Sequence, residues 1–183
     1  MPAYTIKVAV IGNQKVGKSK FCNAFAGIFG SNDYDATVGV RIIDIDTNII
    51  GKSKNGKQKE KFEITLELWD VSGDLKYKDG WKAIQKNCLG IMIMFNPKIM
   101  KSTDVNMWIQ QFMTKKMNIK QCLLILTENI NPQISDGITM FKQLNKIILK
   151  YNNESINNDI KDKIIDWIGT IFGYHSDAEF GVL

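Results

Sequence analysis

The octapeptide Gly-Asn-Gln-Lys-Val-Gly-Lys-Ser at residues 12–19 directly follows the β-branched, apolar run of residues 6–11. The pattern G-x-x-x-x-G-K-S between a strand and a helix is that of a phosphate-binding loop. Its two glycines permit backbone conformations that turn successive N–H groups toward phosphate oxygens at a helix N-terminus. The lysine is expected to reach the β- and γ-phosphates, and the serine hydroxyl to bind Mg²⁺. The expected nucleotide contacts here are Gly12, Asn13, Gln14, Lys15, Val16, Gly17, Lys18, Ser19 and Lys20.

Length and composition favour a single α/β domain. A chain of 183 residues, 44% of them hydrophobic, can bury one core and is short for two. We expect the domain over residues 1–173 and a short tail over residues 174–183. The cysteines Cys22, Cys88 and Cys122 lie in apolar or helical stretches without metal-ligand spacing. This placement is typical of buried thiols in a reducing, cytosolic compartment.

Charge and hydropathy exclude several classes of partner. The net charge of +5 is modest, and the densest basic run, residues 52–61, contains no aromatic residue. Such a run is typical of a solvated hairpin, so we expect no nucleic-acid binding. No stretch approaches the ~18 uninterrupted apolar residues of a membrane span, and the N-terminus lacks the apolar core of a signal peptide.

Strand and helix signals alternate along the chain. Residues 41–46 and 62–69 alternate with period 2, and the Asn-Gly between them predicts a hairpin across residues 54–57. Residues 146–151 fit either the end of an amphipathic helix or a last strand, and we favour a short helix near 138–145 followed by that strand. The other expected elements are a strand at 5–12, a helix at 18–26, buried parallel strands at 89–95 and 123–127, and helices at 104–116 and 159–172.

Two further motifs narrow the kind of nucleotide site, because a phosphate loop alone also suits an ATPase, a kinase or an ABC-type module. Residues 70–73 read D-x-x-G at a strand end, where Asp70 can hold Mg²⁺ through water and the Gly73 N–H can approach a γ-phosphate. Thr37 supplies a hydroxyl in the preceding loop and could complete the Mg²⁺ shell when the γ-phosphate is present. We therefore expect Ser19, Thr37 and Asp70 to bind the metal.

These motifs, in this order, resemble those of the Ras superfamily of small GTPases, and residues 35–40 look like a Rab switch I. The closer resemblance is to the Rab-like GTPase subunit family of intraflagellar transport complex B, over residues 5–172 and most strongly over 37–97. The residues that carry it are Thr37, Gly39–Ile42, Phe62–Glu63, Glu67–Asp70, Gly73–Asp74, Trp81 and Phe95–Asn96.

The resemblance implies a three-layer α/β small-GTPase (P-loop NTPase) fold with a mixed, mostly parallel six-stranded sheet and helices on both faces. It also implies binding of GTP or GDP with Mg²⁺, docking on coiled-coil subunits of complex B, and a place in the cytoplasm, cilium or flagellum, and basal body. Trp81 fits two interpretations equally, a core residue or part of a nucleotide-dependent partner surface.

Three departures from an ordinary Rab bear on catalysis. Small GTPases usually place a glutamine after D-x-x-G to orient the attacking water, and here Asp74 stands there. A carboxylate beside a γ-phosphate repels it and has no amide donor. Gln14 and Lys15 also fill loop positions that are often small. We therefore expect a slow GTP hydrolase, with Asp74 as the residue at the catalytic position.

The base-recognition motif also departs from the family pattern. The N-K-x-D motif, whose aspartate accepts hydrogen bonds from guanine, is expected after residues 123–127, but residues 127–130 read Thr-Glu-Asn-Ile. Glu128 and Asn129 are the candidate substitutes for base contact. Discrimination between guanine and adenine is expected to be weak, because it rests on buried hydrogen bonds of this sort.

The C-terminal sequence bears on membrane attachment. Rabs that cycle on membranes carry C-terminal cysteines for prenylation, whereas this sequence ends Glu-Phe-Gly-Val-Leu and has its last cysteine at Cys122. We expect no direct lipid anchor by this route, which favours a subunit of an assembly. Two alternatives stay open, an active vesicle-trafficking GTPase and a nucleotide-independent scaffold. Evidence against the scaffold comes from the intact Lys18, Ser19, Thr37 and Asp70.

Overall fold

A six-stranded sheet forms the middle layer of the protein, whose computed structural model describes residues 4–29, 35–52, 59–127, 143–149, 151–152 and 155–173. The strand order is β2-β3-β1-β4-β5-β6. β2 runs antiparallel to β3, and every other neighbouring pair is parallel. The strands are β1 (Tyr4–Ile11), β2 (Val40–Lys52), β3 (Lys59–Val71), β4 (Cys88–Phe95), β5 (Cys122–Leu126) and β6 (Asn145–Ile148).

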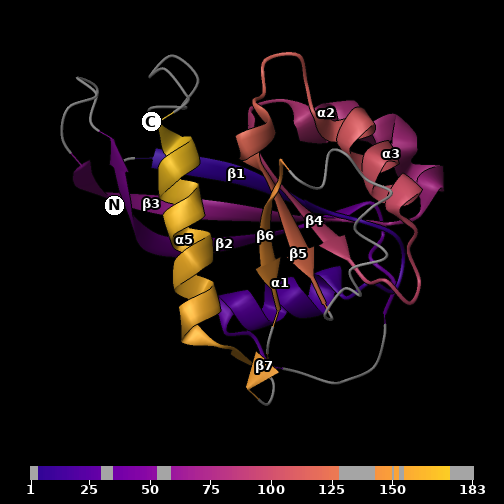
Figure 1. Cartoon of the computed structure of the whole chain (residues 1–183), viewed down its shortest axis with the longest axis horizontal. Helices are drawn as coiled ribbons and strands as arrows, with labels where there is room; N and C mark the ends of the chain where they lie inside the picture. The colour runs from indigo at the N-terminus through magenta and orange to yellow at the C-terminus, as the bar shows by residue number, and fades with distance from the viewer. Residues whose placement is uncertain are drawn as a thin grey trace.

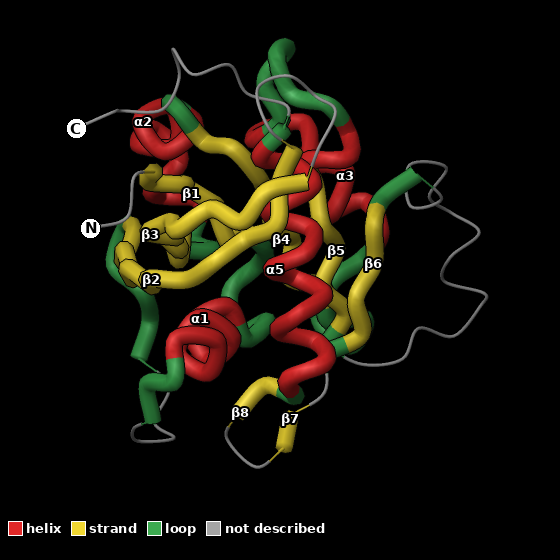
Figure 2. The backbone as a smooth tube through the Cα atoms, turned by 90° about the vertical axis from the view of Figure 1, so that its left-hand side faces the viewer, coloured by secondary structure: helices red, strands yellow, loops and turns green. Residues whose placement is uncertain are grey.

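Helices cover both faces of this sheet. Figures 1 and 2 show α1 (Lys18–Ala26) and α5 (Asn158–Phe172) on one face, with α2 (Trp81–Gln85) and α3 (Ser102–Phe112) on the other. The 3-10 helices η1 (Leu75–Gly80) and η2 (Ile119–Gln121) precede α2 and β5, and the short hairpin β7 (Tyr151–Asn152) and β8 (Ser155–Ile156) precedes α5. The three-layer α/β architecture with a mixed, mostly parallel sheet is confirmed.

The core lies on both faces of the central strands. All eight residues of β4 are buried, as expected for a parallel strand between two layers of helices. The three cysteines are buried free thiols, and burial raises the pKa of Cys88 to about 11 and that of Cys122 to about 12. These thiols are therefore protonated at neutral pH. The largest fully buried side chains are Trp108, Phe21, Phe25, Phe95 and Phe112.

Trp81 belongs to this core and not to an exposed partner surface. Its side chain is 2% exposed, and its ring centroid lies 4.9 Å from that of Trp108 and 5.1 Å from that of Phe112. α2 is thus fixed to α3 through aromatic packing. The first of the two interpretations of Trp81 is confirmed.

Several element boundaries differ from the expected ones. The hairpin strands extend to 13 residues each, because ladder pairing continues from Val40↔Val71 to Lys52↔Lys59 beyond the segments that alternate in hydropathy. α3 begins earlier and ends earlier than 104–116. The Asp104 carboxylate accepts the Lys101 N–H at the start, and Met113 leaves the helix with ψ of 111° at the end.

The region before α5 also differs. The strand expected near 146–151 is β6, which begins and ends earlier, and the hairpin of β7 and β8 was not expected. The expected helix near 138–145 lies mostly outside the described residues, and its last three, residues 143–145, are not helical. The turn at 54–57 and the tail at 174–183 also lie outside the described residues.

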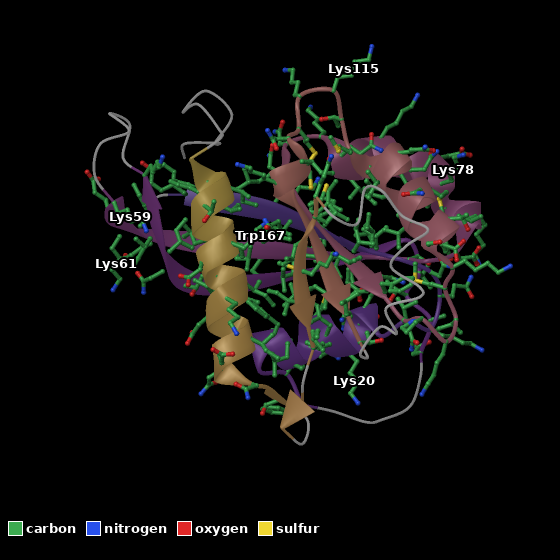
Figure 3. The ribbon with its side chains drawn as sticks, viewed as in Figure 1. Lys20, Lys59, Lys61, Lys78, Lys115 and Trp167 are labelled. Carbon is green, nitrogen blue, oxygen red and sulfur yellow. The ribbon has the colours of Figure 1, made fainter. Side chains whose placement is uncertain are left out.

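The labelled side chains show how charge and packing are distributed. Lys59 and Lys61 project outward from β3, Lys78 from η1 and Lys115 from the segment after α3, while Trp167 lies on α5 (Figure 3). The Trp167 indole N–H donates a 3.0 Å hydrogen bond to the Lys120 carbonyl, which ties α5 to η2.

None of the helices in the described ranges is long and apolar enough to cross a membrane.

Candidate nucleotide site

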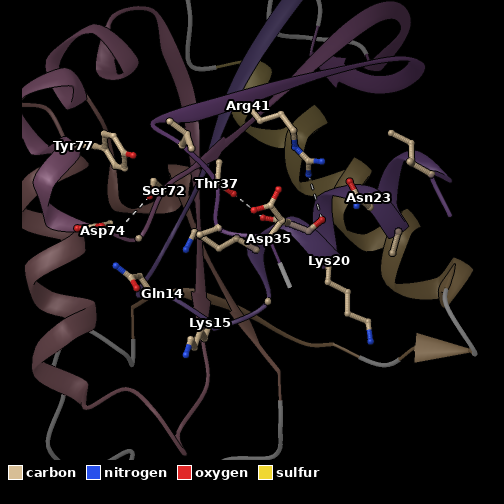
Figure 4. Close-up of a pocket in the computed structure, with 18 of the residues that line it drawn as sticks. Gln14, Lys15, Lys20, Asn23, Asp35, Thr37, Arg41, Ser72, Asp74 and Tyr77 are labelled. Carbon is tan, nitrogen blue, oxygen red and sulfur yellow. Dashed lines mark hydrogen bonds between the residues drawn. The ribbon is translucent and has the colours of Figure 1, made fainter. Parts of the chain in front are cut away.

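A cavity of about 620 Å³ opens beside the N-terminus of α1, within the usual size range of small-ligand sites. Figure 4 shows its lining, which comes from the phosphate loop, α1, a switch I segment (residues 35–41) and a D-x-x-G segment (residues 70–74) with the start of η1. The expected site residues that line it are Gln14, Lys15, Gly17, Lys18, Ser19, Lys20, Thr37, Gly73 and Asp74.

The backbone of the phosphate loop takes conformations that most residues avoid. Gly12 has φ of 140° and Gly17 has φ of 96°, and Lys15 lies in the left-handed region with φ of 63°. A Cβ atom at Gly12 would lie 2.6 Å from the Met94 carbonyl oxygen, so a side chain there would push the loop off β4. Residues 12–17 thus form a narrow turn that ends at the N-terminus of α1, where backbone N–H groups can bind an anion.

Lys18 lies under this loop and is only 6% exposed. Its ammonium group donates hydrogen bonds of 2.9 and 2.8 Å to the carbonyls of Gly12 and Asn13. Burial lowers its pKa to about 8, while the nearby Asp70 opposes the shift. The amine is therefore largely protonated at pH 7 and held where the loop surrounds its ligand.

The three expected metal ligands converge in the structure. The hydroxyl oxygens of Ser19 and Thr37 lie 2.9 Å apart, and the Thr37 hydroxyl donates to Asp70 Oδ2 at 3.4 Å. Asp70 is fully buried, and its Oδ1 has no hydrogen-bond partner within the described part of the chain. Two hydroxyls and a buried carboxylate oxygen suit Mg²⁺, which prefers oxygen ligands and keeps phosphate and water in its remaining positions.

The D-x-x-G segment is packed against the phosphate loop. A Cβ atom at Gly73 would lie 2.7 Å from the Asn13 carbonyl oxygen, so only glycine fits between the two loops. The Ser72 N–H donates a 2.8 Å hydrogen bond to the Gly39 carbonyl, which ties this segment to the switch I segment. The three loops that would surround a γ-phosphate are therefore in mutual contact.

Asp74 lines the cavity, but its carboxylate faces η1. Its Oδ1 accepts the Lys76 backbone N–H at 3.0 Å, and its Oδ2 lies 3.2 Å from the Lys76 ammonium. These contacts, the backbone hydrogen bond first, lower the pKa of the Asp74 carboxyl. Asp74 is thus an ionised N-cap of η1 without a proton to donate.

Other expected residues have different places. The Asn13 side chain points to α3 instead of the cavity, and Val16 is buried in the core, so these two can contact a ligand only through the backbone. Glu128 and Asn129 lie outside the described residues.

Residues that line the cavity but were not among the expected site residues include Asn23, Phe29, Arg41 and Tyr77. Phe29 follows the C-terminal cap of α1 and is 61% exposed, so its ring is available to a flat ligand such as a base. Phe29 lies just beyond the nine residues of α1, which span ~14 Å from the phosphate loop. This position of an aromatic residue relative to the loop is the sequence signal that could have identified it. Arg41 could have been found as the one arginine of the chain.

Residues 7–130, more than half of the chain, match the family described as "Ras of Complex, Roc, domain of DAPkinase". The chain belongs to the Roc family of Ras-like GTPase domains. The match spans the phosphate loop, the switch I segment and the D-x-x-G segment, and ends at the expected base-recognition segment.

Individual relatives extend the similarity beyond the Roc domain match. The chain is 25% identical to the intraflagellar transport protein 22 homolog of Danio rerio over 96% of this chain and 95% of that protein. It is 26% identical to the Homo sapiens homolog over 94% of this chain and 92% of that protein. The intraflagellar transport protein 22 of Trypanosoma brucei brucei is 27% identical over 72% of this chain and 60% of that protein.

Proposed function

We propose that this Roc domain is a GTP- and GDP-binding subunit of the intraflagellar transport machinery that requires Mg²⁺ and hydrolyses GTP slowly. The observation that carries the nucleotide part is a cavity of nucleotide size lined by Lys18, Ser19 and Thr37, with the buried Asp70 carboxylate in contact with the Thr37 hydroxyl behind it. The transport part is supported by the similarity to intraflagellar transport proteins over nearly the whole chain.

The residues have distinct tasks in binding. The N–H groups of residues 13–18 surround the phosphates, and Lys18 exchanges its two carbonyl partners for phosphate oxygens. Ser19 and Thr37 would hold the metal directly and Asp70 would hold it through water, and a bound Mg²⁺ would neutralise phosphate charge. Gly73 brings its N–H to the γ-phosphate without a side chain in the way. The ring of Phe29 packs on the base.

Slow hydrolysis follows from Asp74. A water-orienting residue must accept from the attacking water and donate toward the phosphate, and an ionised carboxylate offers no donor. Both Asp74 oxygens are moreover occupied by contacts with Lys76. The protein binds and positions GTP but lacks the group that activates water.

Mass spectrometry of the nucleotide released from the purified protein tests the nucleotide part. Wild type should release GTP or GDP in about equimolar amount, and Lys18→Ala or Ser19→Asn should release little. Lys163→Ala is the control, because it removes an exposed lysine that pairs with Asp159 on α5. Equal nucleotide content in all four proteins, or none in wild type, would refute the assignment.

The partner part of the proposal is docking on the coiled-coil subunits of complex B and a place in the cilium or flagellum and at its basal body. Size-exclusion chromatography of the chain mixed with those subunits from the same organism should show one co-eluting complex, and a tagged chain should localise to cilia. Separate elution together with absence of the tag from cilia would contradict this role.

A further inference from the structure

Arg41 forms the only contact of a cationic side chain with the metal-binding carboxylate in the described part of the chain. Its guanidinium lies 3.2 Å from Asp70 Oδ2 and donates to the Ser19 carbonyl at 3.5 Å. β2 and β3 place the two residues directly opposite each other in the antiparallel ladder. Figure 4 shows Arg41 reaching from β2 toward α1 at the rim of the cavity, and its side chain is 42% exposed.

The choice of arginine is specific to this position. Of the 24 basic residues Arg41 is the one arginine, so the other 23 (24 minus 1) are lysines. A guanidinium keeps its charge when partly buried, and its planar set of donors can serve a carboxylate and a carbonyl together. Arg41 therefore supplies a permanent positive charge and several hydrogen-bond donors at this position.

The two carboxylate oxygens of Asp70 have different surroundings. Oδ2 is shared by Arg41 and the Thr37 hydroxyl, while Oδ1 is buried and has no partner among the described residues. A divalent cation held by Ser19, Thr37 and Asp70 would share one carboxylate with the guanidinium. Two like-charged groups on one carboxylate repel each other, so each weakens the binding of the other.

We propose that Arg41 is an internal counter-cation of Asp70 that competes with Mg²⁺ and allows the protein to hold its nucleotide with reduced dependence on the metal. Without Mg²⁺, the guanidinium neutralises Asp70, which would otherwise repel the phosphates. With Mg²⁺, it raises the metal concentration needed to fill the site. This inference rests on the proposed nucleotide-binding function.

The opposite role makes the opposite prediction. A positioning residue that only orients Asp70 for the metal would strengthen Mg²⁺ binding, and its removal would raise the Mg²⁺ concentration needed for nucleotide retention. A counter-cation that competes with the metal lowers this concentration when it is removed. The direction of the shift therefore decides between the two roles.

The experiment measures the dissociation rate of a fluorescent GDP analogue from the full chain across a titration of free Mg²⁺. Arg41→Gln should shift the midpoint of the titration about fivefold toward lower Mg²⁺, and should speed release in EDTA by about fivefold. Arg41→Lys should give a smaller shift in the same direction, because it keeps a charge but loses the planar donors. Thermal unfolding of each variant confirms that the comparison is between folded proteins.

Lys163→Gln is the control, because Lys163 also pairs with an aspartate, Asp159, but lies on α5 and does not line the cavity. Its midpoint should stay within about twofold of wild type. An unchanged midpoint in Arg41→Gln, or a shift toward higher Mg²⁺, overturns the role of Arg41 while nucleotide binding stands. A wild-type chain that binds no nucleotide at any Mg²⁺ concentration overturns the proposed function and this inference together.

Discussion

The indole N–H of Trp108 donates a 2.7 Å hydrogen bond to Oδ1 of Asn13 and so joins α3 to the phosphate loop. The Asn13 amide in turn donates to Asp104 Oδ2 at 3.3 Å. Trp108 also packs on Trp81, the first residue of α2. The loop that is expected to bind phosphate is therefore held from behind by the same aromatic cluster that holds the helix after the D-x-x-G segment.

Trp108→Phe should loosen the phosphate loop while keeping most of the buried ring. The substitution removes the indole donor and leaves the side-chain oxygen of Asn13 without this partner, so we expect the free energy of unfolding to fall by about 1–3 kcal/mol. Nucleotide should also dissociate faster, because the loop is less rigid. Chemical denaturation and nucleotide release, measured on the same preparations, test both effects.

Trp167→Phe is the control for this loss. The Trp167 indole makes a similar hydrogen bond, 3.0 Å to a carbonyl, but it lies on α5 and makes this bond to η2. It should cost a similar amount of stability and leave the nucleotide release rate near that of wild type. If both variants release nucleotide at the same rate, the Trp108 bond does not position the loop.

The contrast between Asn13 and its neighbours shows what the sequence could predict. The positive φ of Gly12 and the position of Lys18 and Ser19 beside the cavity agree with the loop conformation expected from the sequence, because a phosphate loop is a local structure whose residues carry their own conformational and chemical requirements. Asn13 was expected to contact the nucleotide, but the contact of its side chain with Trp108, 95 residues away, was not expected. No spacing pattern reports such a tertiary contact, since it depends on how α3 packs on the sheet.

Other differences have the same physical origin. The continuous apolar run of β4 identified a strand buried on both faces, but the ends of β2 and β3 depended on pairing between two strands rather than on either sequence. The replacement of glutamine by Asp74 was visible in the sequence, whereas its turn toward Lys76 became visible only with η1 in place. The importance of Arg41 likewise depends on the residue opposite it in the ladder.

Gly73→Ala should impair the contact between the D-x-x-G segment and the phosphate loop. Its Cβ would overlap the backbone at Asn13, which cannot move away as a flexible side chain could. Overpacking of this kind costs about 1–3 kcal/mol, and we expect weaker binding of GTP in particular because the Gly73 N–H is the group proposed to contact the γ-phosphate. Gly80→Ala is the matched control, since nothing lies within 4 Å of its added Cβ. Similar GTP affinities in the two variants would refute the packing argument.

Nucleotide affinity should fall at alkaline pH because of Lys18. Its pKa is about 8 in the free protein, and bound phosphate raises this pKa by favouring the ammonium form. Between pH 7 and 9 the free protein loses most of this charge, so the affinity should drop about tenfold. Titration calorimetry at several pH values measures the drop, and Lys18→Ala should bind weakly with a flat profile.

Unfolding does not explain such a drop, because the stability effect of Lys18 has the opposite sign. The folded pKa lies below the ordinary value of 10.5, so the unfolded chain binds more protons between about pH 8 and 10.5. The contribution of Lys18 to the free energy of unfolding therefore rises with pH in this window. An affinity that stays constant up to pH 9.5 would show that the Lys18 charge does not contact the nucleotide.

Discrimination between GTP and ATP should be weaker than in a protein with the full N-K-x-D motif. Residues 127–130 offer Glu128 and Asn129 but an isoleucine in place of the aspartate. Loss of paired buried hydrogen bonds lowers the discrimination below about 10⁵-fold, although we expect GTP to remain the preferred ligand. Calorimetric titration with both nucleotides measures the ratio. A ratio above this value would mean that Glu128 replaces the aspartate fully.

GTP hydrolysis by the isolated protein should be no faster than ~10⁻⁴ per second, the intrinsic rate of a Ras-type enzyme without an activating protein. Asp74→Gln supplies an amide donor and removes the negative charge, so single-turnover hydrolysis should rise moderately, with Gln14 and Lys15 still obstructing the water.

Asp74→Asn is the matched control. It removes the same charge and caps η1 equally well, but its shorter amide lies farther from the γ-phosphate. A rise in the Gln variant alone assigns the effect to the donor, whereas equal rises assign it to the lost charge. A fall in both variants, or fast hydrolysis by wild type, would show that Asp74 takes part in the reaction.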